Sequence, residues 1–276
     1  MREGDTVTTV VLNHELAQRL EQSEIECLES RLSAFQQLQG NPMGVEIQKF
    51  GQATAFSVRN IPGPSFNTVK GLKTGDEHAI EEMGNFYEQK EIPARFELAP
   101  ANTSSELLTC LSRAGYYHHD FHTALYGTLS KKAKIEIQPN IGIHKLDRDE
   151  FDTFANIYVK GFGMPDFLKN GVAQNNKILY DIEGWTFYLA TYENVPAGIG
   201  VLFIKDDIAT LAAAATMPSL RNRGIQSALI NHRINEAIDK GCSLIVGQVR
   251  FRSVSQNNME RAGLQIAYTK AIWTEK

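Results

Sequence analysis

The chain has 276 residues, which is long for one small hydrophobic core and fits two domains of ordinary size. Its net charge of −4 lacks the basic excess expected of a nucleic-acid-binding protein, and no apolar run is long enough to span a membrane. Three scattered cysteines and a first segment (MREGDTVTTVV) without the basic and apolar blocks of a signal peptide predict buried thiols and a cytoplasmic location.

Apolar spacing in the first half of the chain predicts alternating helices and strands. A helix is expected at 13–39, because apolar residues recur there at helical intervals until Asn41–Gly44. Strands are expected at 45–50 and 53–61, before a loop rich in proline and glycine. The further elements predicted are a helix at 76–90, a strand at 94–98, a helix capped by Ser104 or Ser105 and stopped at Gly115, and a strand at 116–129.

The second half follows a proposed join at 131–140. A strand at 141–146 precedes Asp147 and Glu150, which have the spacing of a capping box in front of a helix that begins near Phe151. Strands followed by helix, strand, helix and strand predict an α+β fold with a mixed sheet and helices on both faces. The remaining elements are predicted as helices at 172–181, 224–240 and 254–262, and strands at 185–192, 197–204, 208–216, 242–249 and 264–273.

A basic turn, Arg221-Asn222-Arg223-Gly224, joins the strand 208–216 to the next helix. Gly224 has no Cβ, so the backbone amides around it can point at one spot, where the first helical turn leaves them without internal acceptors. The helix dipole and the two arginines make that spot positive. The turn therefore predicts a phosphate or pyrophosphate site, with an ordinary solvated turn as the alternative.

The order strand, proline, Arg-x-x-Gly-x-x and helix resembles the acyl-CoA-binding motif of the GNAT acetyltransferase superfamily. Residues 255–264 (SQNNMERAGL) are similar to the Ser…Asn…Arg-x-Gly-Phe segment that closes many members of that superfamily. Gln226 stands where the family pattern has a small residue. The resemblance covers 140–276, and the residues at family positions are Pro218, Arg221, Gly224, Asn258 and Gly263.

The resemblance implies an N-acetyltransferase in which a primary amine attacks the thioester of acetyl-CoA directly. It implies a small-molecule amine or a peptide as acceptor, and no metal, nucleic acid or membrane partner. The strand before Pro218 would hold the pantetheine arm, and the turn would hold the phosphates. The cofactor-binding residues that it implies are Ala214, Ala215, Thr216, Arg221, Asn222, Arg223, Gly224, Ile225, Gln226, Ser227 and Asn258.

Groups for proton transfer are harder to find. The family's usual acid is a tyrosine four residues before the glycine of its Gly-Phe segment, and here that position is Met259. Tyr268 on the next strand is the substitute candidate, with a buried structural tyrosine as the alternative, and Asn258 is the other candidate catalytic residue. No carboxylate lies on the strand 208–216. A non-catalytic acyl-CoA-binding or sensing protein is therefore the second hypothesis.

An internal repeat accounts for the first half. SRAG at 112–115 and ERAG at 260–263 are separated by 148 residues, and the same offset aligns two helices and two strands. It places Asp76 on Gly224 and Glu77 on Ile225, and two carboxylates there would repel a polyphosphate. We therefore predict two GNAT-like domains, a degenerate copy without a CoA site at 1–133 and a CoA-binding catalytic copy at 134–276.

One cluster suggests a metal by its composition. His118, Asp120 and His122 alternate along a predicted strand and share one face, as metal ligands can. No further ligand is evident nearby, and a polar solvent-facing side of the strand explains the pattern equally well. We predict no metal.

Overall fold

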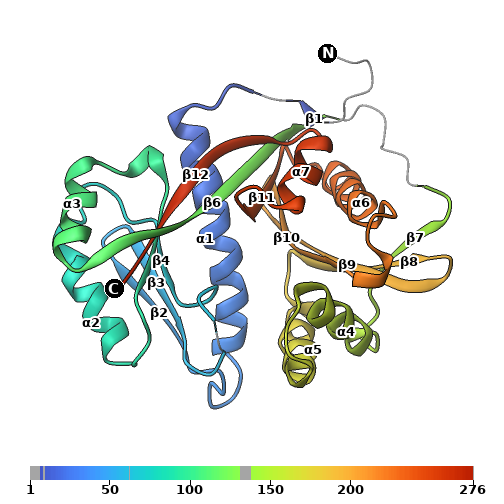
Figure 1. The fold of residues 1–276 in the computed structure, drawn as a ribbon, viewed down its shortest axis with the longest axis horizontal. Helices are drawn as coiled ribbons and strands as arrows, with labels where there is room; N and C mark the ends of the chain where they lie inside the picture. The colour runs from blue at the N-terminus through green and yellow to red at the C-terminus, as the bar shows by residue number, and fades with distance from the viewer. Residues whose placement is uncertain (1–6, 9, 62, 131–137, 276) are drawn as a thin grey trace. The chain divides into compact units, whose positions relative to one another are not determined.

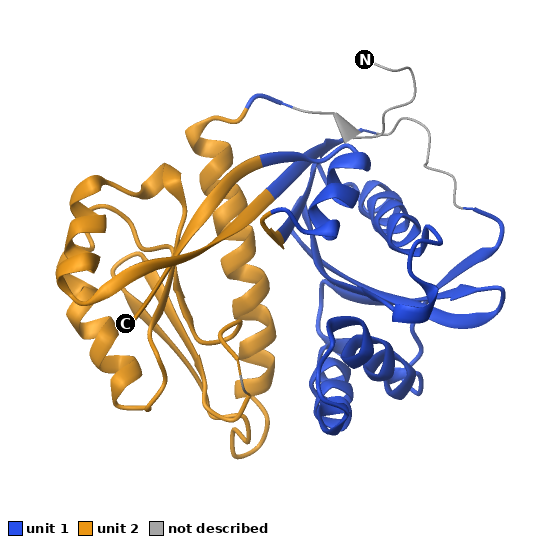
Figure 2. Ribbon diagram, viewed as in Figure 1, with its two compact units in different colours: residues 1–11, 125–248, 252–266 blue, residues 12–124, 249–251, 267–276 orange. Residues whose placement is uncertain are grey.

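The computed structural model describes residues 7–8, 10–61, 63–130 and 138–275. The chain divides into two compact units, each discontinuous along the sequence (Figure 2). Unit 1 comprises 1–11, 125–248 and 252–266, and unit 2 comprises 12–124, 249–251 and 267–276. The join predicted at 131–140 falls largely on residues outside the described ranges. The functional division into a copy without CoA at 1–133 and a CoA-binding copy at 134–276 stays a prediction.

Unit 2 is built on a mixed sheet in the order β2-β3-β4-β5-β12-β6. The pairs β2–β3 and β3–β4 are antiparallel, whereas β4 and β5 are parallel. In Figure 1, α1 lies on the opposite side of these strands from α2 and α3. The elements are α1 (His14–Gln36), β2 (Val45–Phe50), β3 (Ala53–Val58), β4 (Thr68–Lys70), α2 (Ile80–Glu88), β5 (Arg95–Leu98), α3 (Ser105–Arg113), β6 (Tyr116–Leu129) and β12 (Gln265–Glu275).

Unit 1 repeats this arrangement with the strand order β6-β11-β10-β9-β8-β7. The pairs β8–β9 and β9–β10 are antiparallel and β10–β11 is parallel. Figure 1 shows α4 and α6 on opposite sides of these strands. The elements are β1 (Val7–Thr8), which pairs with β6, β7 (Ile141–Lys145), α4 (Phe151–Phe162), α5 (Lys169–Ile178), β8 (Trp185–Tyr192), β9 (Val195–Lys205), β10 (Ile208–Thr216), α6 (Ile225–Asp239), β11 (Leu244–Arg250) and α7 (Val254–Arg261).

The predicted α+β fold and the predicted repeat are both confirmed. The series β2, β3, β4, α2, β5, α3, β6 has the same order and strand directions as β8, β9, β10, α6, β11, α7, β12. Short 3₁₀ segments complete the chain at Glu77–Ala79, Pro100–Asn102, Asp166–Leu168, Leu179–Asp181 and Pro218–Leu220.

The last strand of each copy belongs to the sheet of the other copy. In unit 2, β12 pairs antiparallel with β5, from Ala271↔Leu98 to Thr274↔Arg95. In unit 1, the end of β6 lies beside β11, and the Leu129 amide donates to the Ser243 carbonyl at 2.8 Å. Each copy therefore completes its sheet with a strand that follows the other copy's helices.

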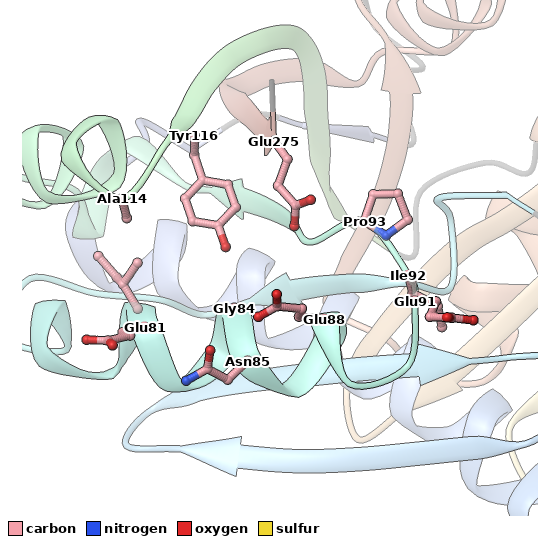
Figure 3. A pocket seen from close by; sticks show the side chains of 11 residues that line it. Glu81, Gly84, Asn85, Glu88, Glu91, Ile92, Pro93, Ala114, Tyr116 and Glu275 are labelled. Atoms are coloured by element: carbon pink, nitrogen blue, oxygen red, sulfur yellow. The ribbon is translucent and has the colours of Figure 1, made fainter.

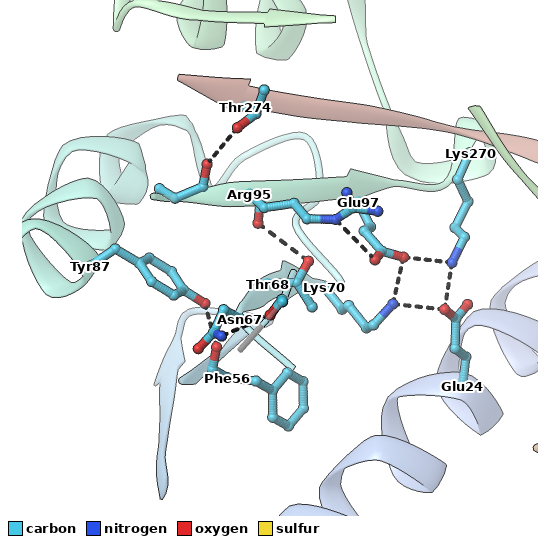
Figure 4. Close-up of polar contacts among 12 residues, drawn as sticks. Glu24, Phe56, Asn67, Thr68, Lys70, Tyr87, Arg95, Glu97, Lys270 and Thr274 are labelled. Atoms are coloured by element: carbon cyan, nitrogen blue, oxygen red, sulfur yellow. Dashed lines mark hydrogen bonds and ion pairs between the residues drawn. The ribbon is translucent and has the colours of Figure 1, made fainter. Parts of the chain in front are cut away.

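Four charged side chains meet in the interior of unit 2 (Figure 4). Lys70 Nζ lies 2.7 Å from Glu24 Oε1 and 2.6 Å from Glu97 Oε2. Lys270 Nζ lies 2.5 Å and 2.8 Å from the same two oxygens. Burial alone raises the pKa of Glu97, but the charges of Lys270 and Lys70 outweigh it and hold that pKa well below its usual range. The two lysines and two carboxylates balance one another, and Arg95 adds a partly exposed cation, with its Nε 3.5 Å from Glu97 Oε1.

His122 on β6 makes the stability of unit 2 sensitive to acid. Burial, aided by the charge of Lys270, lowers the pKa of His122 from 6.5 to about 4. Because the folded pKa is depressed, His122 contributes its full stability above pH 6.5 and loses it as the pH falls towards 4. We expect the free energy of unfolding to decline across this window by at most about 1.4 kcal/mol per pH unit from this group.

Urea titrations at pH 7, 6 and 5 would check this expectation. His122→Gln should flatten the decline, whereas the exposed His78→Gln should leave it as in the wild type. Parallel pH profiles for the wild type and His122→Gln would contradict the assignment.

Among the residues described, none of the helices combines the length and the apolar composition that crossing a bilayer requires.

Candidate active site

The site begins where two parallel strands of unit 1 stop pairing. The register of β10 with β11 runs from Ile208↔Leu244 to Leu211↔Gly247. The pairing of β10 with β9 continues to Thr216↔Gly198, with a register shift between Leu211 and Ala213. The last residues of β10 thus keep a described strand partner on one side only, which leaves their other side available to a ligand.

A buried arginine supports the irregular part of β10. The Arg233 side chain on α6 is 1% exposed. Its Nη1 donates to the carbonyls of Ala213 and Val201, each at 3.1 Å, and its Nε donates to Leu229 at 2.9 Å. Arg233 therefore satisfies the carbonyl beside the register shift and fixes the course of the strand. Burial lowers the pKa of Arg233 to about 10, so it remains charged at neutral pH.

The basic turn has the backbone that its sequence predicts. Asn222 has a φ of +62°, and Gly224 has a φ of +79°, in the left-handed region. Gly224 is the N-cap of α6, and no side chain caps the helix there. The first amides of α6, at Ile225, Gln226 and Ser227, therefore lack the usual side-chain acceptor and can meet an anion.

Both arginines of the turn are held in place by neighbouring groups of unit 1. Arg221 Nη2 donates to the Gly161 carbonyl at 2.8 Å, at the end of α4. Arg223 Nη1 donates to the Tyr192 hydroxyl at 3.2 Å, and its guanidinium lies 5.0 Å from the centre of that ring. These contacts keep two positive charges beside the uncapped end of α6.

Thr216 and the alanines before it connect the strand to the turn. The Thr216 hydroxyl oxygen is buried without a hydrogen-bond partner in the described part of the chain. α4 approaches β10 so closely that a Cβ on Gly161 would lie 2.7 Å from the Ala215 Cβ. Ala214 is half-buried. The small side chains here let α4 pack close to β10, and the unpartnered Thr216 hydroxyl suits a polar ligand.

The family model of the acetyltransferase (GNAT) family matches residues 151–259, which include this strand, turn and helix. The chain carries a GNAT acetyltransferase domain. The domain belongs to a family of acyltransferases that use acetyl-CoA, as the resemblance of the turn predicted. No curated protein sequence matches the chain.

Solved structures share the fold along nearly the whole chain. A tandem GNAT protein from the clavulanic acid biosynthesis pathway, without acetyl-CoA, is 10% identical, with a TM-score of 0.63 over 96% of this chain and 97% of its own. A GCN5-related N-acetyltransferase from Kribbella flavida is 13% identical, with a TM-score of 0.61 over 89% and 95%. A conserved protein of unknown function from Staphylococcus epidermidis is 12% identical, with a TM-score of 0.60 over 84% and 94%. At such identities the likeness shows the fold alone, and it agrees with the predicted fold of two GNAT-like copies.

The structure adds Gln248 to the candidate residues of the GNAT domain. A Cβ on the preceding residue, Gly247, would meet the Met259 sulfur of α7 at 2.7 Å, so alternation along β11 turns Gln248 to the opposite face. Both polar atoms of its side chain are buried without partners among the described residues. Gln248 follows the last residue of β11 that pairs with β10, so it lies where these two strands separate.

The two predicted catalytic residues belong to different units. Asn258, on α7 of unit 1, accepts a hydrogen bond from Arg261 Nη1 at 3.1 Å. Met259, at the position of the family's tyrosine, is buried and packs against Gly247 as a core residue. Tyr268 belongs to unit 2, where burial together with Glu24 and Glu21 raises its pKa. The role of Tyr268 as an acid stays a prediction.

The equivalent turn in the first copy is occupied by its own carboxylates. Glu77 Oε2 accepts from the Gly75 amide at 2.7 Å. Asp76 is buried, and a Cβ on Gly51 would lie 2.4 Å from its Oδ1. That the first copy does not bind CoA stays a prediction, and these contacts place two carboxylates at its turn.

The histidine pattern on β6 has a structural explanation. His118 Nε2 lies 3.0 Å from the Asp120 carbonyl oxygen, and its ring contacts Phe121 edge-on. His122 is half-buried, so the polar face of this strand is not wholly exposed to solvent. In the described ranges, no three His, Cys, Asp or Glu side chains converge as metal ligands do.

Proposed function

We propose that the chain is an N-acetyltransferase that transfers the acetyl group of acetyl-CoA to a primary amine. The observation that carries the proposal is the separation of β10 from β11, directly followed by a left-handed Gly224 and an uncapped α6. An extended backbone edge and a phosphate cradle, in that order, fit the pantetheine arm and the pyrophosphate of one CoA molecule.

Each part of the site has a role in this proposal. The backbone of Ala214, Ala215 and Thr216 would bond the pantetheine amides, and the free Thr216 hydroxyl offers a further polar contact. The amides from Asn222 to Ser227 and the side chains of Arg221 and Arg223 would hold the phosphates. Asn258 would contact the cofactor from α7.

The chemistry is a direct transfer. The amine nitrogen attacks the thioester carbonyl carbon, the carbon–sulfur bond breaks, and the thiolate takes up the proton that the amine gives away. Backbone amides at the strand separation would stabilise the developing oxyanion. Gln248 lies on the face of β11 away from Met259, and we propose that it positions the amine acceptor, a small molecule or a peptide.

A non-catalytic acyl-CoA-binding or sensing protein is the second candidate function. It is favoured by Met259, a buried thioether at the position where a proton donor would be expected. Such a protein would keep the phosphate cradle and release no thiol.

Two measurements on the full chain test these functions. Acetyl-CoA at about 100 times its Kd is expected to stabilise the protein by about 2.7 kcal/mol, seen as a higher Tm. Release of free CoA thiol across a panel of amines and peptides would then identify the enzyme and its acceptor. Stabilisation without turnover on a broad panel would favour the sensor, and no stabilisation would reject both functions.

A further inference from the structure

Unit 2 contains an open pocket of about 650 Å³ that belongs to no site described above. It lies between α2, the segment that follows it, the start of β6 and the end of β12 (Figure 3). Its volume falls in the range of small-molecule sites, about 300–1,000 Å³. Its polar lining comes from Glu81, Asn85, Glu88, Glu91, Tyr116 and Glu275.

A buried tyrosine points its hydroxyl into this pocket. Tyr116 is 7% exposed, and its ring packs edge-on against Phe96 with the ring centres 4.8 Å apart. Figure 3 shows the hydroxyl turned towards α2, between Gly84 and the Glu275 carboxylate. Burial, aided by Glu275 and Glu88, raises the pKa of Tyr116 to about 12, so the hydroxyl stays protonated. It has no hydrogen-bond partner among the residues that the structure describes.

The helix makes room for that hydroxyl. Gly84 lies in the middle of α2, where glycine weakens a helix relative to alanine. A Cβ at this position would lie 2.8 Å from the Tyr116 hydroxyl oxygen. Gly84 therefore leaves the space that the Tyr116 hydroxyl occupies. Alanine would form the helix better, but its Cβ would fill that space.

The charge around the pocket is negative and unbalanced. Glu81, Glu88 and Glu91 form no ion pair within the described ranges. Two cations adjoin lining residues in the sequence. Lys90 is engaged elsewhere, since its Nζ lies 3.1 Å from Glu46 and 3.8 Å from the centre of the Phe86 ring. Arg113 precedes Ala114 and is exposed, and the four carboxylates of the lining outnumber it. The pocket therefore favours a cationic ligand.

The spacing of the carboxylates selects an extended cation over a metal ion. Glu81 and Glu88 are separated by two helical turns, or about 10 Å along α2 at 1.5 Å per residue. No cluster of three metal-binding side chains occurs in the described residues, these glutamates included. Ile80, Ile92 and Pro93 also line the pocket and can contact a methylene chain.

We propose that this pocket binds a linear polyamine, with one ammonium group on Glu81, another on Glu88, Glu275 and the Tyr116 hydroxyl, and its methylene groups against Ile80, Ile92 and Pro93. The site lies in unit 2, apart from the residues of the GNAT turn, and does not depend on acetyl transfer. The polyamine is a bound ligand here and undergoes no reaction.

Isothermal titration of the full chain with spermidine at low ionic strength tests the proposal. Saturable binding is expected, and Glu88→Gln should weaken it about tenfold, since one charge-assisted hydrogen bond is lost. Tyr116→Phe should weaken it less, because it removes a neutral acceptor. Gly84→Ala should weaken it by moving the tyrosine hydroxyl.

Glu82→Gln is the matched control, because Glu82 is exposed on the same helix and does not line the pocket. It should bind spermidine as the wild type does. Equal weakening by Glu82→Gln and Glu88→Gln would show diffuse charge attraction and overturn the proposal, as would the absence of saturable binding. Mg²⁺ binding as tight as spermidine binding, measured at matched ionic strength, would also overturn the proposal in favour of a metal site.

Discussion

Lys270→Met is expected to lower the free energy of unfolding by about 3–5 kcal/mol, the usual cost of removing one partner from a buried ion pair. The Lys270 side chain is 2% exposed, and both its carboxylate partners are also held by Lys70. Without Lys270, Lys70 is the only fully buried cation described near the two carboxylates, and the partly exposed Arg95 reaches only Glu97, at 3.5 Å. Glu24 is then left with half of its buried positive charge. Equilibrium unfolding in urea at pH 7 measures the loss.

An exposed ion pair provides the control for this variant. Lys145 Nζ lies 3.1 Å from Glu236, but its side chain is 58% exposed, so Lys145→Met should cost less than about 1 kcal/mol. Adding Glu97→Gln to Lys270→Met should recover part of the loss, because the excess negative charge disappears. A loss for Lys270→Met no larger than that for Lys145→Met would refute the importance of the buried cluster.

The regular elements were predictable wherever a residue pattern was long enough. The helix at His14–Gln36 and the strand at Tyr116–Leu129 appear within a few residues of their predicted ranges. β4, at Thr68–Lys70, was missed because three residues are too few to show alternation, and all three are buried. Without β4, the prediction lacked the parallel β4–β5 pair, which corresponds to the parallel β10–β11 pair of the second copy.

The exchange of last strands could not be predicted from the repeat. The constant offset in sequence shows that β6 and β12 are equivalent. Because β5 and β11 are equivalent too, the offset does not tell which of them each last strand pairs with. The choice becomes visible only through contacts, such as Lys270 of β12 with Glu24 and Glu97. The same exchange places Tyr268 in unit 2, although counting along the sequence puts it just after the GNAT segment.

The phosphate turn was predictable because its signal is local. A glycine next to an arginine at a helix start implies a left-handed backbone and open amides, and both are present at Gly224. Arg233 and Gln248 were missed, since their roles depend on neighbouring strands. Arg233 carried one usable signal: it is a cation on a helix face otherwise formed by Leu229, Ile230 and Ala237. Gln248 carried a weaker signal, as a polar residue after an apolar run.

Gly224→Glu is expected to abolish the stabilisation by acetyl-CoA of about 2.7 kcal/mol at 100 times Kd. Glycine is required at this position for two reasons. Its φ of +79° costs other residues about 1–2 kcal/mol, and any side chain would begin among the amides that cap the phosphate. A carboxylate there would also occupy the positive helix end and repel the pyrophosphate, as we predict for Asp76 and Glu77 in the first copy.

Gly241→Glu separates the loss of binding from the backbone strain. Gly241 has nearly the same φ, +78°, lies just beyond the other end of α6, and offers open space in which a Cβ would meet no neighbouring atom within 4 Å. Both variants should therefore lower Tm in the absence of ligand, and Gly224→Glu by at least as much as Gly241→Glu, because a Cβ on Gly224 would lie 3.3 Å from the Gln138 side-chain oxygen. Only Gly241→Glu should regain stability when acetyl-CoA is added, because its phosphate cradle is intact. A ligand-induced shift retained in Gly224→Glu, or lost in Gly241→Glu, would remove the turn from the CoA site and with it the main support for the proposed acetyl transfer.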